Sequence, residues 1–451
     1  MKSLVLFAKI TVAIFFCLVA VFVGNYFLSL KEQTILVEKY SWLPTEEKIE
    51  NLSLSESQYA ASIKYNKKSY GRTSRGISPV STAAATGTGT TTKKIVLPIP
   101  VIAPKLSESL IPVNNSQKII NGIAAGGVLT GMSEAQLRNY FNELKKLGIV
   151  WVRWDMDWSE IQKDGPTRYN WSGSDLVAKI LKEYNLQSLV ILGYAPKWAG
   201  EVGCVPDNHC SPQDAQIFAN FATQAALRYK GTIKNWEIWN EQNSRAFWSP
   251  KPSVEKYSEV LKASYAAIKT VDPTATVITG GLSPVEGSSS TIEPVKFVTK
   301  LYALNSKDSF DAIALHPYAY PLSPASTQPW NYWFQMYKVY DIMNINGDAK
   351  KDIWITEYGA PTGGSGDAHE LKQLNFFSYG KDYMSENAQA TMMSDVISEV
   401  TKIDSWVGPV FWYSLLDTNS TSADPEGHFG LITSGYEAYK SAYFKLLNSG
   451  N

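Results

Sequence analysis

Two glutamates of this 451-residue chain end short β-rich runs that lie far apart in the sequence. Glu241 belongs to the stretch NWEIWNEQN at residues 235–243, and Glu357 belongs to WITEYGAP at residues 354–361. Two carboxyl groups roughly 5 Å apart can cleave a glycosidic bond with retention, because one protonates the leaving oxygen and the other attacks the anomeric carbon. The two glutamates are therefore our candidates for chemistry.

Polar and aromatic residues at the ends of other runs suit the same chemistry. A nucleophilic carboxylate must stay ionised, which a cation such as Arg153 and a donor such as His316 would favour. Asn240 could donate a hydrogen bond to a sugar hydroxyl. The competing interpretations are that Arg153 pairs only with Asp155 or Asp157, and that His316 is an ordinary core histidine. Other expected substrate-binding residues are Tyr318 and three tryptophans that could form floor and walls for sugar rings, Trp198, Trp248 and Trp412.

Glu237, four residues before Glu241, points to the same side of an extended strand. Four residues of strand separate the two by roughly 13 Å, so Glu237 falls deeper than the end of the run. A carboxyl group at that depth needs polar partners. We interpret Glu237 as a structural group bonded to an arginine or a tyrosine of a neighbouring strand.

Eight β-rich runs alternate with helical patterns and must position these residues. Such alternation predicts a (β/α)8 TIM barrel, in which groups at the carboxyl ends of the strands line the active site. An open doubly wound sheet is the alternative, but no Gly-rich phosphate loop follows the first run. A helix is predicted over residues 133–148, where Ser133 and Gln136 form a capping box. The runs cover residues 121–128, 149–155, 187–194, 235–241, 275–281, 310–318, 352–359 and 408–415.

The residues before the barrel divide into three parts. Residues 10–30 are almost uncharged and long enough to span a bilayer, and the preceding residues 1–9 carry two lysines, which favours a cytoplasmic N-terminus. We predict an uncleaved transmembrane signal anchor, with a cleaved signal peptide and a secreted protein as the alternative. Residues 31–117 predict a stalk with a flexible Ser/Thr-rich linker. Residues 118–451 then form the catalytic domain, outside the cytoplasm in either case.

Charge and cysteine content limit the partners and the compartment. Lys plus Arg and Asp plus Glu number 42 each, so no net charge favours nucleic acid. Cys204 and Cys210 flank a short Pro/Asp/Asn segment and predict a disulfide, which suits an oxidising compartment. A metal site with His209 is the alternative, although a fourth ligand is missing. We expect neither a metal nor an organic cofactor.

Several segments resemble clan A glycoside hydrolases, most closely glycoside hydrolase family 39, with family 5 cellulases second. The resemblance covers about residues 120–447 and implies that the acid/base glutamate follows Asn240, as Glu241, and that the nucleophile ends the seventh strand, as Glu357. The anchor and tether are similar to the design of bacterial exopolysaccharide hydrolases of family 39. The matching segments are LGIVWVRWDMDW, LGYAPKWA, NWEIWNEQN, YAAIKTVDPTATVITGGL, FDAIALHPY, IWITEYGAPT and VFWYSLLD.

The resemblance implies a retaining hydrolase of a polysaccharide with β-linked sugars, and the apolar run at residues 10–30 predicts that it is membrane-anchored and acts in the periplasm or at the cell surface. Aromatic residues spread over several loops favour endo action. Two other functions stay open: a non-catalytic polysaccharide-binding protein of an export or biofilm system, and an exo-acting β-glycosidase such as a β-xylosidase. Turnover of any glycan would separate the first from an enzyme. The sequence gives neither the sugar and its linkage nor the oligomeric state.

Overall fold

The computed structural model describes residues 119–204, 209–328, 330–371, 377–403 and 405–449. The predicted cytoplasmic N-terminus, transmembrane anchor and stalk at residues 1–117 lie outside the described residues. Within the described ranges, no helix is both long and apolar enough to cross a membrane.

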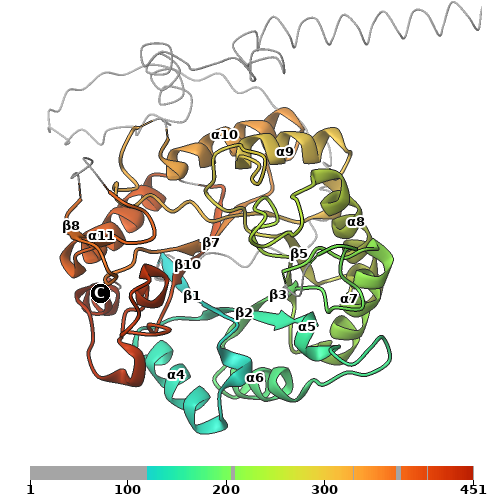
Figure 1. The fold of residues 1–451 in the computed structure, drawn as a ribbon, viewed down its shortest axis with the longest axis horizontal. Coiled ribbons are helices and arrows are strands. Elements are labelled where there is room, and N and C mark those ends of the chain that lie inside the picture. Colours follow the sequence, from blue (N-terminus) through green and yellow to red (C-terminus); the bar gives the residue numbers. More distant parts are fainter. Residues whose placement is uncertain (1–118, 205–208, 329, 372–376, 404, 450–451) are drawn as a thin grey trace, which may run out of the picture. The chain divides into compact units, whose positions relative to one another are not determined.

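Eight parallel strands form a closed barrel (Figure 1). Their order is β5-β4-β3-β2-β1-β10-β7-β6. Parallel bridges from Ile278 to Ala312 and from Leu282 to Leu315 close the ring between β5 and β6. The predicted barrel is therefore confirmed, and the open doubly wound sheet is wrong. The strands are β1 (Ile120–Gly126), β2 (Trp151–Asp157), β3 (Gln187–Gly193), β4 (Asn235–Ile238), β5 (Thr276–Thr279), β6 (Ile313–Leu315), β7 (Ile353–Tyr358) and β10 (Val407–Tyr413).

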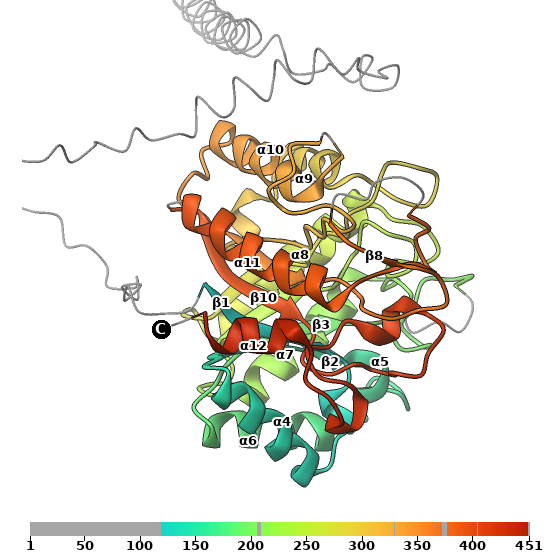
Figure 2. The same cartoon turned by 90° about the vertical axis from the view of Figure 1, so that its left-hand side faces the viewer.

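Helices surround the barrel, as both views show (Figures 1 and 2). A separate pair of two-residue strands, β8 (Ala368–His369) and β9 (Tyr383–Met384), lies in the segment after β7 and was not predicted. Four short 3-10 turns complete the described part. The helices are α4 (Glu134–Lys146), α5 (Trp158–Ile161), α6 (Ser172–Glu183), α7 (Ala215–Tyr229), α8 (Val254–Val271), α9 (Pro294–Ala303), α10 (Tyr332–Ile345), α11 (Glu386–Lys402) and α12 (Ser441–Leu447).

Helix α4 illustrates how the local sequence sets an element. Ser133 accepts a hydrogen bond from the backbone N–H of Gln136, and the Gln136 side chain accepts one from the backbone of Ser133, so the predicted capping box is present. Leu137, Phe141 and Leu144 recur at helical spacing and are fully buried. The helix is thus fixed at its start by polar groups and along its length by one apolar face.

The barrel interior changes from apolar to charged along the strands. Trp151 packs against a cluster inside the barrel that includes Leu189, Ile278 and Phe411. Two residues further along β2, on the same side of the strand, Arg153 is buried among polar groups instead. The apolar layer therefore closes the bottom of the barrel, and the charged layer above it forms the floor of the site.

Candidate active site

Glu357 lies near the carboxyl end of β7 and is held by two donors. Nη1 of Arg153 donates to Oε1 of Glu357 at 2.5 Å, and the hydroxyl of Tyr318 donates to Oε2 at 2.8 Å. Burial by itself would raise the pKa of Glu357, but the charges of His316 and Arg153 and the Tyr318 hydrogen bond outweigh it, so the pKa is lowered. Glu357 is thus kept ionised, as a nucleophile must be.

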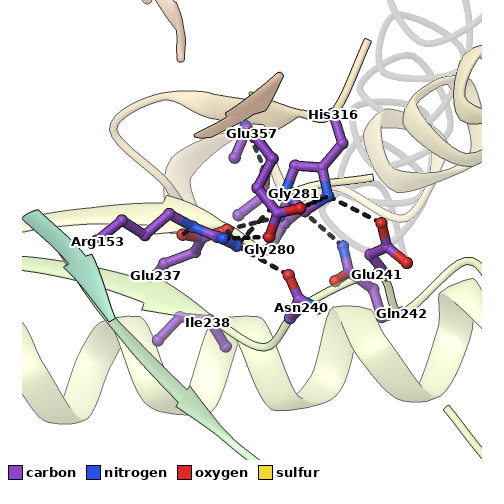
Figure 3. Close-up of polar contacts among 12 residues, drawn as sticks. Arg153, Glu237, Ile238, Asn240, Glu241, Gln242, Gly280, Gly281, His316 and Glu357 are labelled. Atoms are coloured by element: carbon purple, nitrogen blue, oxygen red, sulfur yellow. Dashed lines mark hydrogen bonds and ion pairs between the residues drawn. The ribbon is translucent and has the colours of Figure 1, made fainter. Parts of the chain in front are cut away.

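Glu241 follows β4 by three residues, in an unusual backbone conformation. Its φ is 48° and that of Trp239 is 72°, both in the left-handed region that side chains other than glycine rarely adopt. The backbone N–H of Glu241 donates to the carbonyl of Gly281 at 2.8 Å, which holds the turn in place. Oε1 of Glu241 lies 2.9 Å from Nδ1 of His316. The turn thus directs the carboxyl group toward His316 (Figure 3).

The two candidate carboxylates come close to each other. One oxygen of Glu241, one oxygen of Glu357 and one ring nitrogen of His316 all lie within 4.8 Å of one another. Retaining glycosidases place their two carboxyl groups about 5–5.5 Å apart, whereas inverting enzymes leave about 6.5–9.5 Å for a water molecule. The separation here fits retention.

Arg153 connects the nucleophile candidate to a second buried carboxylate. Nε and Nη2 of Arg153 donate to the two carboxylate oxygens of Glu237 at 2.6 and 2.9 Å, and Nη2 also donates to Oδ1 of Asn240 at 2.8 Å. Both Arg153 and Glu237 are fully buried. Glu237 is thus a buried support bonded to an arginine, as predicted, and Arg153 pairs with Glu237 and Glu357 rather than only with a neighbouring aspartate.

His316 occupies a space that only a glycine leaves free. A Cβ atom added to Gly281 would lie 2.0 Å from Nε2 of His316. That nitrogen is 3.3 Å from Nη2 of Arg153, while Nδ1 faces Glu241. His316 is buried, but both ring nitrogens contact the site, so it is more than an apolar core residue.

Glu241, His316 and Glu357 are also the described residues whose ligand atoms could hold a metal ion. The guanidinium of Arg153, however, donates to Glu357 and lies beside His316. A divalent cation on these ligands would lie against that fixed positive charge, which would repel it. The arrangement therefore suits proton transfer and nucleophilic attack better than a metal centre.

Glu241 and Glu357 open into a cleft of about 1100 Å³ at the mouth of the barrel. Asn240 and Tyr318 line it, as the sequence predicted, while Arg153 and His316 lie behind the carboxylates. Aromatic residues that the sequence analysis did not single out form much of the wall. They are Tyr194, Phe247, Tyr320, Tyr332, Phe377, Tyr379 and Phe429.

The sequence model of glycosyl hydrolase family 53 matches residues 119–445, which include the barrel and both glutamates. The chain belongs to glycosyl hydrolase family 53. It is an O-glycoside hydrolase of clan A. No curated protein matches the sequence of this family 53 chain.

Solved structures similar to the family 53 chain share its fold. A family 39 glycoside hydrolase from Bacteroides cellulosilyticus WH2 is 20% identical with a TM-score of 0.56, over 74% of this chain and 64% of that chain. A family 39 enzyme from Xanthomonas axonopodis pv. citri is 16% identical with a TM-score of 0.55, over 74% and 66%. This chain thus spans just under two thirds of each. A monomeric β-xylosidase from Caulobacter crescentus CB15 is 15% identical with a TM-score of 0.54, over 74% and 68%.

The family 53 match confirms the predicted clan. Identities of 15–20% show the barrel fold alone. The predicted resemblance to family 39 therefore stays a likeness of fold beside the membership in family 53.

The three predicted tryptophan platforms do not line the cleft of the family 53 barrel, and that prediction is corrected. Trp248 is fully buried and its ring packs edge-on against Trp239 at 5.0 Å. Nε1 of Trp198 donates to the carbonyl of Gln162 at 2.7 Å, so this ring is used in packing the loop after β3.

The prediction for Trp412 is wrong for a different reason, which is the alternation of side chains along β10. Successive residues of a strand point to opposite faces. Phe411 and Tyr413 therefore face the barrel interior, and Trp412 packs outward in the core between strands and helices. Tyr413 lines the cleft in its place.

Cys204 and Cys210 form the predicted disulfide, with a Cα–Cα distance of 6.0 Å. The alternative, a metal site formed by the two cysteines and His209, is therefore wrong, because both sulfur atoms are in the disulfide. His209 itself lines the cleft, and its ring centroid lies 4.7 Å from that of Tyr194 and 4.8 Å from that of Phe247. The sequence analysis missed this role, for which the only signal was the position of His209 beside a predicted crosslink.

Proposed function

We propose that this protein is a retaining glycoside hydrolase that cleaves a β-linked polysaccharide by double displacement. Glu357 is the nucleophile and Glu241 is the acid/base. The observation that carries the proposal is the approach of one oxygen of each carboxylate to within 4.8 Å, with Arg153 and Tyr318 donating to Glu357 and not to Glu241. This asymmetry assigns the roles, because the group with the cation and the hydroxyl is the one kept ionised.

In the first step, an ionised oxygen of Glu357 attacks the anomeric carbon while Glu241 gives its proton to the leaving oxygen. The glycosidic bond breaks and a glycosyl ester with Glu357 forms. The contact of 2.9 Å between His316 and Glu241 fixes the orientation of the carboxyl group that transfers the proton. His316 therefore acts as a positioning residue.

In the second step, Glu241, now a carboxylate, removes a proton from a water molecule that attacks the same anomeric carbon. The ester bond breaks, the sugar leaves with retained configuration, and Glu357 regains its negative charge. Arg153 and Tyr318 again donate to it. Glu241 ends the cycle protonated.

The dimensions and lining of the cleft support endo action on a polymer. A volume of about 1100 Å³ exceeds the roughly 300–1,000 Å³ typical of pockets for one small ligand. Rings from loops after several strands line it, and flat rings match the apolar faces of sugars. The clan and the predicted likeness to exopolysaccharide hydrolases of family 39 favour a β-linked extracellular polymer.

We also propose that the barrel works outside the cytoplasm, anchored by residues 10–30 and held on a stalk at 31–117. The apolar run and the flexible composition of these segments support this. The disulfide between Cys204 and Cys210 supports an oxidising compartment. Protease protection of the full-length protein in intact cells would test the orientation.

The test is hydrolysis of a panel of extracellular polysaccharides, with products sized by mass spectrometry. We expect mixed internal fragments from one or more β-linked polymers, and loss of at least about a thousand-fold in rate in Glu357→Gln. An activated aryl glycoside needs little proton donation, so Glu241→Gln should keep the first step on it while Glu357→Gln should not. Exposed Glu160→Gln is the matched control. Near-normal turnover by Glu357→Gln would contradict the mechanism.

A further inference from the structure

Carboxyl groups dominate the charge of the active-site cleft. Six line it, although the whole chain carries equal numbers of acidic and basic residues. No lysine or arginine is found among the described residues that line the cleft. Beyond Glu241 and Glu357, the lining carboxyl groups are Asp155, Asp157, Glu286 and Glu426.

These acids lie around the mouth rather than in one patch. Asp155 and Asp157 are on β2, Glu286 lies in the loop after β5, and Glu426 lies in the turn after β10. In the strand order of the barrel, β2, β5 and β10 are not neighbours. A sugar chain that crosses the mouth therefore passes carboxyl groups on different sides.

The nearest cation does not balance this charge. Arg153 is fully buried below the cleft, and its donors are taken by Glu237, Glu357 and Asn240. One positive charge facing Glu237 and Glu357 leaves that cluster with a net charge of −1. The additional acids along the cleft thus have no protein cation to offset them among its lining residues.

Asp155 is the deepest of these additional acids and lacks a partner. Its Oδ1 is buried without any hydrogen bond. Burial raises the pKa of Asp155 to about 7; Arg153 opposes this, while the charges of Asp157, Glu357 and Glu237 add to it. A buried carboxyl oxygen without a donor is costly, so a ligand that brings a charged N–H donor would gain the most here.

The aromatic lining favours the same sign of charge. Tyr194, Tyr320, Trp330 and Tyr413 are among the rings along the cleft. The face of an aromatic ring carries negative electrostatic potential and attracts an ammonium group. Rings and carboxyl groups therefore both disfavour a polyanion such as a polyuronate, and both favour a cation.

We propose that the cleft binds polysaccharides whose sugars carry protonated amino groups, such as polymers of hexosamine units without N-acetyl groups. The inference rests on the proposed function, since it names the substrate class of the same cleft. Asp155 lines the same cleft as Glu357 and would receive one ammonium group of the bound polymer, while Glu286 and Glu426 would receive others.

The experiment compares hexamers that share the β-1,4-gluco backbone and differ only at carbon 2: a hydroxyl in cellohexaose, an acetamido group in chitohexaose and an ammonium in the glucosamine hexamer. The full-length protein carrying Glu357→Gln is titrated by calorimetry in low and in high salt. The pH is about 7, because burial raises the pKa of Asp155 and of Glu426 to about 7 and both would be largely neutral at a lower pH. We expect the glucosamine hexamer to bind at least about ten-fold tighter than cellohexaose in low salt. High salt should reduce this preference.

Two double variants locate the effect. Glu286→Gln with Glu426→Gln should reduce the preference by at least about three-fold. Glu259→Gln with Glu437→Gln also removes two carboxyl groups, from exposed positions outside the cleft lining, and should leave the preference unchanged. Absence of glucosamine-hexamer binding, equal binding of cellohexaose, or equal effects of the two double variants would overturn the inference.

The outcomes also separate the two proposals. Hydrolysis of a neutral β-linked polymer by the wild type, without preferential binding of the glucosamine hexamer, would contradict the inference and leave the proposed function supported. Preferential binding of the glucosamine hexamer without turnover of any polymer would support the inferred binding preference and contradict the proposed hydrolase function.

Discussion

Tyr318→Phe should shift the acid limb of the pH–rate profile and do little else. The change removes one hydroxyl, which donates to Oε2 of Glu357 at 2.8 Å. The ring of Tyr318 stacks on Tyr358 at 6.1 Å, and phenylalanine keeps that contact. The variant therefore tests the hydrogen bond rather than the packing.

The size of the shift follows from the charge on the acceptor. A hydrogen bond to an ionised group contributes about 1.5–3 kcal/mol, and one pKa unit corresponds to about 1.4 kcal/mol. Because the Tyr318 hydroxyl stabilises only the ionised form, its loss should raise the pKa of Glu357 by about one to two units. The Arg153 contact remains and keeps the carboxylate functional above that pKa.

The assay is kcat/KM against pH on a substrate that the hydrolysis panel identifies, since its acid limb reports ionisations of the free enzyme. We expect that limb to move to higher pH by about one to two units, with a much smaller loss of rate on the plateau. Tyr320→Phe is the control, because Tyr320 also lines the cleft but makes no described bond to Glu357. An unmoved acid limb, or equal shifts in both variants, would refute the reasoning.

The buried charges beside Glu357 give two more expected outcomes. Arg153→Lys replaces the fork that bonds Glu237, Glu357 and Asn240 by a single ammonium, so the free energy of unfolding should fall by about 3–5 kcal/mol, measured in urea; an unchanged midpoint would contradict it. The pKa of Asp155 is raised to about 7 in the folded protein, so its ionisation opposes folding and stability falls as pH rises from about 4 to 7. Asp155→Asn should remove a penalty on the order of 4 kcal/mol above pH 7, seen as a higher Tm than wild type at about pH 8 and a smaller difference at about pH 4; a lower Tm at both would refute it.

Much of the barrel could be predicted because each strand carries its own signal. The eight β-rich runs correspond to the eight barrel strands, and Glu237 could be placed below Glu241 from strand spacing alone. The sequence analysis predicted that Glu237 bonds an arginine or a tyrosine of a neighbouring strand, and the partner is Arg153.

The cleft wall was harder to predict because it depends on loops and on side-chain direction. Trp412 and Tyr413 are adjacent, so only the exact register of β10 decides which faces the interior. Trp248 looks like a sugar platform in sequence but is fully buried against its neighbours. His209 reaches the cleft through the geometry of a crosslinked loop, which sequence spacing does not encode.

The two hydrogen bonds from Arg153 to Glu237 matter at the covalent stage of the reaction. With Glu357 ionised, the group of Arg153, Glu237 and Glu357 carries one excess negative charge. When Glu357 becomes an ester, that charge disappears and the remaining pair is neutral and still doubly bonded. Glu237 therefore acts as a permanent tether for the guanidinium, which need not follow the nucleophile through the cycle. The same donor is in place when the ester breaks and the carboxylate returns.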